Sequence, residues 1–169
     1  RRLSQIYQRD DGADVFNLQT AGGNIRDFVM DNVTLLGGRR GLNLLRAEYN
    51  LFRNVVFSKN KEYGLYSYIG GIGNLFDQCW WVHLAGNVLG MGGSGSLVIR
   101  NSVIGEDVGS IDAGSEVTLT NCNMWGMADK LRGNGMYDAG KSAINIMSGT
   151  SLKINGCKIS PSPEAANCF

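Results

Sequence analysis

The sequence predicts an all-β protein, a single-stranded parallel β-helix of six to seven coils with about 22 residues in each coil. Three observations support this fold class. A six-residue segment recurs along the chain, apolar and polar residues alternate within it, and 24 glycines and 16 asparagines occur among the 169 residues. So much glycine and asparagine indicates many bends, whereas the apolar share of 43 % is typical of a chain with a core.

The recurring segment places an asparagine, a glutamine or a glycine at its third position. The steps between successive copies are 22, 24, 23, 20 and 35 residues. Because repeats of this length are typical of solenoid proteins, we interpret the chain as a stack of coils. The six copies are MDNVTL (30–35), FRNVVF (52–57), FDQCWW (76–81), IRNSVI (99–104), LTNCNM (119–124) and INGCKI (154–159).

Apolar residues keep fixed distances from the third position of this segment. The residues two before and three after it are all apolar, and the residue directly after it is small or apolar. Because side chains alternate along a strand, this pattern predicts two short strands that meet at a bend. Asparagine suits such a bend because it tolerates left-handed backbone geometry. The predicted bend residues are Asn32, Asn54, Gln78, Asn101, Asn121 and Gly156.

A second motif precedes the recurring segment and predicts a third strand in each coil. Gly41, Gly64 and Gly86 begin its three clearest copies, 23 and 22 residues apart, and looser copies follow at 107–108 and 143–146. A unit this small cannot bury its own apolar side chains, so it must stack on its neighbours. A β-sandwich with strands every ~8–12 residues is the alternative, but it does not explain the recurrence of residue types.

The repeat also divides the chain into segments. We expect a lead-in at residues 1–14, the β-helix at 15–160 and a tail or linker at 161–169, which follows the last repeat and contains both prolines. The long step of 35 residues predicts an insertion near 126–140, either a plain surface loop or a functional excursion. Because the chain begins Arg1-Arg2, we expect a piece of a longer polypeptide.

The charge and the cysteines exclude several classes of function. A net charge of +1 gives no electrostatic reason to bind nucleic acid or an anionic membrane. The four cysteines show no paired spacing, so we expect no zinc site, and no other metal or cofactor. Three of them follow the bend residue, at the position that valine and serine fill in other copies, and are predicted to be core residues: Cys79, Cys122 and Cys157.

Charged residues in equivalent positions are expected to form ladders, because adjacent coils lie about 5 Å apart. The residues before the first four bends read aspartate, arginine, aspartate, arginine, which favours a structural ladder over a catalytic role. Arg26 and Glu48 form a similar candidate pair. The only histidine, His83, falls between Lys59 and Glu106; acid–base work is one interpretation and a polar turn ladder the other.

These residues, over about 15–160, resemble the pectin-lyase-like superfamily of right-handed parallel β-helices. The resemblance rests on the repeated bend and on the Gly-Leu-x-Leu strands. Within that superfamily, the glycine- and asparagine-rich texture resembles bacteriophage tailspikes and tail-fibre depolymerases. This resemblance implies a homotrimer of the virion tail that binds, and often cleaves, bacterial surface polysaccharide such as capsule or lipopolysaccharide. The alternative location is that of a secreted bacterial protein.

Carboxylate pairs are the candidates for glycosidic cleavage. Retaining glycosidases hold two carboxyl groups ~5 Å apart and inverting ones ~6.5–9.5 Å apart, distances that one or two coil steps supply. We predict a catalytic set from Glu62, Glu106 and Asp107. A lyase would instead need a basic residue beside calcium-binding aspartates. Arg40 and Arg46 are spare cations near the strands, but no aspartate cluster is visible.

Aromatic residues gather in the second to fifth coils. Trp80 is predicted to point outward beside Val56 and Val103, with Trp81 pointing inward. Exposed rings suit the apolar faces of sugars, whereas a trimer interface is the equal alternative. The predicted carbohydrate-binding residues are Tyr49, Tyr66, Tyr68, Trp80 and Trp125.

The sequence therefore leaves three candidate functions. The first is a tailspike-type β-helix that binds and hydrolyses bacterial polysaccharide. The second is a non-catalytic structural or carbohydrate-binding module, which the explanation of most charges as ladders favours. The third is a secreted polysaccharide lyase on the same fold.

Overall fold

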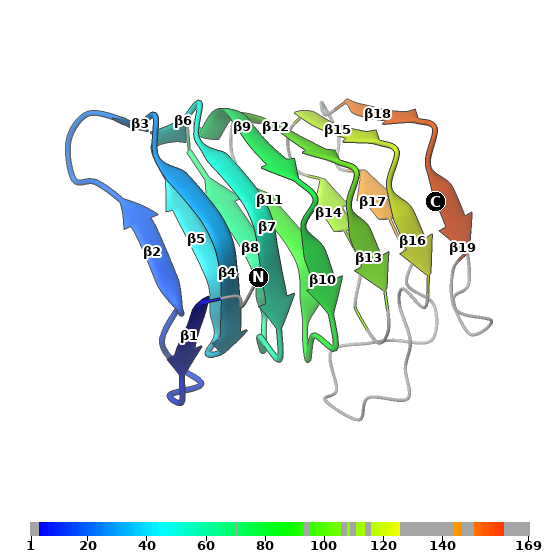
Figure 1. Ribbon diagram of the computed structural model, residues 1–169. Coiled ribbons are helices and arrows are strands. Elements are labelled where there is room, and N and C mark those ends of the chain that lie inside the picture. The colour runs from blue at the N-terminus through cyan, green and yellow to red at the C-terminus, as the bar shows by residue number, and fades with distance from the viewer. Residues whose placement is uncertain are drawn as a thin grey trace.

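The computed structural model describes residues 4–69, 71–92, 95–105, 108, 111–113, 116–125, 144–146 and 151–160. Within these residues the chain forms strands and no helix. The strands lie side by side in a row that runs from the N-terminal to the C-terminal coils (Figure 1). The part of the chain that is described therefore contains no helix that could cross a membrane.

Three parallel sheets form the walls of the coil. Sheet B contains β2 (Phe16–Gln19), β5 (Arg40–Leu45), β8 (Tyr63–Tyr68), β11 (Asn87–Gly92), β14 (Ile111–Ala113) and β17 (Ile144–Ile146). The small sheet C pairs β3 (Ile25–Arg26) with β6 (Ala47–Glu48). Sheet A contains β1 (Ser4–Gln8), β4 (Val29–Gly37), β7 (Leu51–Ser58), β9 (Gly71–Asp77), β10 (Trp80–Val82), β12 (Gly95–Arg100), β13 (Val103–Gly105), β15 (Glu116–Thr120), β16 (Asn123–Trp125), β18 (Leu152–Asn155) and β19 (Lys158–Ser160).

Each coil passes once through sheet B and twice through sheet A, and β4 and β7 span both passes as single strands. The strands of sheets A and B pair in parallel with the equivalent strands of neighbouring coils. About four turns, from β2 to β13, are described almost completely, and two further coils are described in part. The predicted parallel β-helix is confirmed. The expected lead-in contributes β1, which pairs with β4, whereas the expected insertion near 126–140 and the tail 161–169 lie outside the described residues.

The predicted bend residues separate the two passes through sheet A. All six have a positive φ, between 51° and 62°. Asparagine and glycine reach this left-handed region at lower cost than other residues. The repeated asparagine is therefore explained by the backbone geometry of one corner of the coil.

The core is a narrow column of apolar side chains that stack from coil to coil. Phe52 stacks on Phe76 with ring centroids 4.6 Å apart, and Phe57 stacks on Trp81 at 4.8 Å. Their rings are nearly parallel, with interplanar angles of 8° and 12°. The alternation predicted around the bend is confirmed, because these four side chains are completely buried.

The register of sheet B corrects one prediction. Asn87 pairs with Tyr63, and Leu89 pairs with Leu65, so Val88 lies beside Gly64 in the position expected for Gly86. The reason is coil length, because 24 residues rather than 22 separate Gly64 from Val88. The expected copy at 107–108 is also displaced, since β14 begins at Ile111, whereas the copy at 143–146 is confirmed by β17.

Gly64 shows why glycine occurs on the inner side of this wall. Its φ is not positive, and a Cβ there would lie 2.6 Å from Cδ1 of Trp81. Contacts below 3.0 Å between a Cβ and another heavy atom essentially never occur. Glycine is needed at this position for close packing rather than for a bend.

Candidate functional site on the outer face of sheet B

The predicted charge ladder lies beside the bend in sheet A. Arg53 Nη2 lies 2.7 Å from Asp31 Oδ2, and Arg100 Nη2 lies 2.9 Å from Asp77 Oδ2. The hydrogen bond from Arg100 lowers the pKa of Asp77 below its usual value. Asn101 donates a further hydrogen bond to Asp77. The structural interpretation of these residues is confirmed, and the expected pair of Arg26 with Glu48 also forms, at 2.7 Å.

The outer face of sheet B, formed by the outward side chains of β2, β5, β8 and β11, follows a different rule. After the first two coils, equivalent positions there carry different residues. One row reads Asn17, Asn43, Tyr66 and Gly90 along four neighbouring strands. Asn43 donates a hydrogen bond to Asn17 at 2.9 Å. Because packing between the coils does not require different residues at these positions, we take this face as the candidate functional site.

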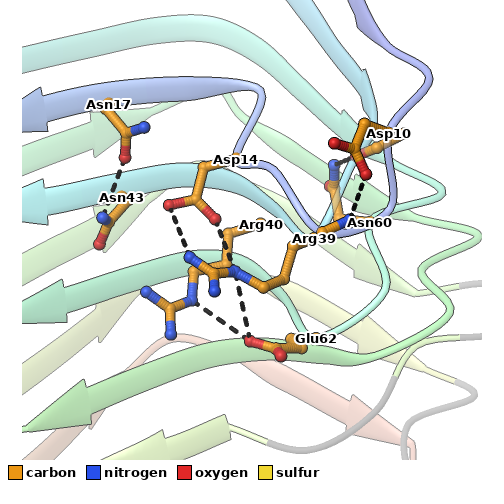
Figure 2. A network of polar contacts seen from close by, with 10 residues as sticks. Asp10, Asp14, Asn17, Arg39, Arg40, Asn43, Asn60 and Glu62 are labelled. Carbon is orange, nitrogen blue, oxygen red and sulfur yellow. Dashed lines mark hydrogen bonds and ion pairs between the residues drawn. The ribbon is translucent and has the colours of Figure 1, made fainter.

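Four charged side chains form a cluster at the edge of this face, where the chain enters sheet B. Arg39 Nε lies 3.0 Å from Asp14 Oδ1 and 3.8 Å from Glu62 Oε2, and Arg40 Nε lies 3.4 Å from the same Glu62 oxygen. Figure 2 shows these side chains converging from three successive coils. The hydrogen bond with Asp14 is the largest of the effects that raise the pKa of Arg39.

The cluster brings two carboxylates close together. Because Asp14 Oδ1 and Glu62 Oε2 both contact Arg39 Nε, these two oxygens lie at most about 6.8 Å apart. Glycosidases separate their two carboxyl groups by about 5 Å or about 6.5–9.5 Å. This upper limit allows the shorter separation, that of retaining enzymes, although the ion pairs with arginine engage the oxygens that would carry the chemistry.

Three tyrosines of β8 form a row next to the charged cluster. The ring centroids of Tyr63 and Tyr66 are 5.2 Å apart, and those of Tyr66 and Tyr68 are 6.4 Å apart. Tyr68 is 44 % exposed. Arg40 links the row to the cluster, because its guanidinium carbon lies 4.0 Å from the centroid of Tyr66, a cation–π distance.

The two arginines predicted to be spare cations are both engaged. Arg40 pairs with Glu62 and packs on Tyr66, and its Nε is buried without a hydrogen-bond partner. Arg46 donates to the carbonyl of Ala21 at 2.8 Å. The interpretation of Arg40 and Arg46 as spare cations is therefore wrong.

The structure separates the five predicted sugar-binding aromatics. Tyr66 and Tyr68 lie together on the outer face of sheet B. Tyr49 lies at a corner between β6 and β7 with a φ of 54° and is 59 % exposed. Trp80 and Trp125 lie on sheet A, and Trp80 points outward between Val56 and Val103, as predicted.

Of the three predicted catalytic residues, the structure describes only Glu62, since Glu106 and Asp107 lie outside the described residues. His83 and Lys59 occupy one corner of the coil with φ values of 50° and 56°. The backbone N–H of Lys59 donates to the carbonyl of His83, which confirms that they are neighbours.

Cys79 and Cys122 are confirmed as core residues, whereas Cys157 is only half-buried and packs against the core. Burial raises the pKa of the Cys79 thiol to about 12 and that of Cys122 to about 11. The backbone N–H of Cys122 donates to Cys157 Sγ at 3.4 Å, so these two lie on neighbouring coils. Protonated buried thiols are poor nucleophiles and metal ligands, and the described residues contain no cluster of three metal-binding side chains.

Sequence reasoning missed three residues of the site, namely Asp14, Arg39 and Tyr63. Asp14 and Arg39 precede the strand motif by one to three residues, and their contact with Glu62 depends on how three coils align. The signal for Tyr63 was available, because Tyr63, Tyr66 and Tyr68 occur within six residues of one predicted strand. A concentration of tyrosine in a single copy of a repeat indicates a local role.

Comparison with known proteins agrees with the fold. A family model described as a right handed beta helix region matches residues 17–167. The match includes every described strand from β3 to β19, and it supplies the handedness of the coil. No curated protein and no solved structure shows a significant match to the chain.

Proposed function

The chain belongs to the right-handed β-helix family, and we propose that it binds polysaccharide through the outer face of sheet B. The observation that carries the proposal is the row of Tyr63, Tyr66 and Tyr68 next to the paired charges of Arg39, Arg40 and Glu62. Aromatic rings pack against the apolar faces of sugars, and charged side chains form strong hydrogen bonds with hydroxyl groups.

The site also has the geometry that an extended polymer needs. A stack of parallel strands offers a long, regular surface, and the outward side chains of adjacent coils lie about 5 Å apart. A chain of sugars can therefore meet several coils at once. The ligand that we propose is a bacterial surface polysaccharide, capsule or lipopolysaccharide, as the resemblance to tailspikes implies.

We propose in addition the virion tail as the location, with secretion as the alternative, and a homotrimer as the assembly. The outward column of Val56, Trp80 and Val103 on sheet A supports this assembly, because apolar side chains favour an interface. Light scattering during gel filtration tests it, and a monomer at micromolar concentration contradicts it.

Binding is tested with Tyr66→Ala and Tyr68→Ala and an array of purified bacterial surface polysaccharides. Each substitution removes a ring from the proposed site, so we expect affinity to fall about tenfold, the value of one good aromatic contact. Tyr7→Ala is the matched control, because Tyr7 is 62 % exposed and belongs to β1 of sheet A. Equal affinities for all variants, or no binding by the unmodified protein, contradict the proposal.

Hydrolysis is the second candidate function, favoured by the distance between Asp14 and Glu62. Release of reducing ends from a bound polysaccharide would support it. Asp14→Asn and Glu62→Gln keep the shape of each side chain but remove its charge, so both should abolish release if these carboxylates do the chemistry. Binding without release by the unmodified protein leaves the non-catalytic module as the function.

A further inference from the structure

Two glycines of β11 lie under the tyrosine row. A Cβ at Gly90 would be 2.5 Å from Cε1 of Tyr63, and a Cβ at Gly92 would be 2.6 Å from Cδ2 of Tyr68. Contacts this short essentially never occur, so no other residue fits without moving the rings. The rings of Tyr63 and Tyr68 therefore lean over the backbone of the next coil.

This arrangement decides which part of each ring is available. Ring atoms Cδ2 and Cε2 of Tyr68 lie against Gly92, and the side chain remains 44 % exposed. A ring that lies on the sheet presents its opposite face outward, whereas an upright ring would present mainly its edge. The outward face of an aromatic ring is the surface on which a sugar ring stacks.

The charges beside this platform cancel one another. Asp14 pairs with Arg39, Glu62 pairs with Arg39 and Arg40, and Lys61 pairs with Asp11. Three acidic and three basic groups thus form two sets of ion pairs, the four-residue cluster and the pair of Lys61 with Asp11. Among these described residues no cation remains without an acidic partner. An acidic sugar could therefore bind an arginine only by displacing the carboxylate that already pairs with it.

Neutral hydroxyl groups fit the same cluster without that cost. A hydroxyl donates to a carboxylate oxygen and accepts from a guanidinium N–H, so it bonds to both members of an ion pair. Arg40 is also held between Glu62 and Tyr66, which fixes its guanidinium for such a contact.

We infer that the outer face of sheet B takes an uncharged polysaccharide, whose sugar rings stack on Tyr63 and Tyr68 where Gly90 and Gly92 leave room for these rings over the backbone. This inference rests on the proposed function. It adds the chemical class of the ligand and two positioning residues that carry no functional group of their own.

The ligand class is tested on an array of bacterial polysaccharides sorted into neutral and uronate-containing polymers. We expect the neutral polymers to bind, with an affinity that changes less than about twofold between low and high salt, because little charge is neutralised. Tighter binding of acidic polymers, weakened by salt, overturns the inference but keeps polysaccharide binding. Binding of neither class contradicts the proposed function as well.

The positioning role is tested with Gly92→Ala, which leaves every tyrosine in place. We expect affinity to fall about three- to tenfold, because the added methyl group lifts the Tyr68 ring from the sheet. Gly22→Ala is the matched control, since nothing lies within 4 Å of a Cβ there. Unchanged affinity of Gly92→Ala overturns the role of this glycine.

A double variant separates positioning from general damage to the fold. If Gly92 acts only through the ring, Gly92→Ala adds no loss of affinity to Tyr68→Ala. An additional loss in the double variant shows that Gly92→Ala disturbs more than the ring and contradicts the positioning role. Circular dichroism of each variant confirms that the β-helix is intact.

Discussion

Two surfaces of this β-helix follow opposite rules. At the bend of sheet A, each coil repeats the same solution, with left-handed residues from Asn32 to Gly156 and alternating pairs such as Asp77 with Arg100. On the outer face of sheet B the residues change from the second coil onward, as in the row from Asn43 to Tyr66 to Gly90, and only Asn17 with Asn43 repeats in that row.

The difference shows how a solenoid divides its residues between stability and function. A repeated residue is explained by the contact that it makes with its own copy in the next coil. A residue that occurs in one coil alone has no such explanation, so the tyrosines of β8 indicate a task specific to that place. Substitutions on the two surfaces and in the core should therefore differ in their cost.

The core column should tolerate truncation least. Phe52→Ala removes a completely buried ring that stacks on Phe76, so we expect a loss of about 3–5 kcal/mol in the free energy of unfolding. Urea unfolding followed by circular dichroism measures it. Tyr68→Ala on the outer face of sheet B should cost less than about 1 kcal/mol. Similar losses for both variants would break the comparison.

The buried thiol of Cys79 predicts a loss of stability at alkaline pH. Its pKa is raised from 9.0 to about 12, so above pH 9 the unfolded chain gives up a proton that the folded chain retains. Stability therefore falls as pH rises from 9 towards 12, by about 1.4 kcal/mol per pH unit.

The measurement compares denaturant unfolding of the unmodified protein and of Cys79→Val between pH 8 and 10.5. Valine suits this position because Val55 fills it in the preceding coil. The difference in stability between the two proteins should shrink by about 2 kcal/mol over this range. A constant difference would show that the thiol titrates alike in both states.

Asparagine substitutions compare the two surfaces directly. Asn101 has a φ of 51°, so Asn101→Ala should cost about 1 kcal/mol, and Asn101→Gly should recover most of that loss. Asn43 has no positive φ, and Asn43→Ala removes only an exposed hydrogen bond to Asn17. The melting temperature of Asn101→Ala should therefore be lower than that of Asn43→Ala. The reverse order contradicts the explanation from backbone geometry.

The smallest effect is expected from the charge ladder. Arg100 is 46 % exposed, so Arg100→Gln should lower the stability less than any of the substitutions above at neutral pH. The ion pair with Arg100 lowers the pKa of Asp77, so it stabilises the folded protein above pH 3.8, the ordinary pKa of this carboxyl group in the unfolded chain. This stabilisation is lost as the pH falls below 3.8. Unfolding curves of both proteins at pH 7 and pH 2 should converge at the lower pH.

Some of the site was predictable from the sequence. The position of Tyr66 between Leu65 and Ser67 predicts an outward side chain, and the structure buries both neighbours. Glu62 precedes the same strand. Its partners were not predictable, because Asp14 and Arg39 come from different coils and their alignment depends on the length of each connection.

By itself the sequence determined the parallel β-helix, the inward columns and the bend, because alternation and repetition are local patterns that survive changes in coil length. Only the tertiary structure decided that Val88 rather than Gly86 lies beside Gly64, and that Gly90 and Gly92 lie under tyrosine rings. The physical reason is register. Where one coil is two residues longer than another, every later residue is displaced relative to the coil beside it. Side-chain contacts between coils therefore depend on the summed lengths of the coils that precede them.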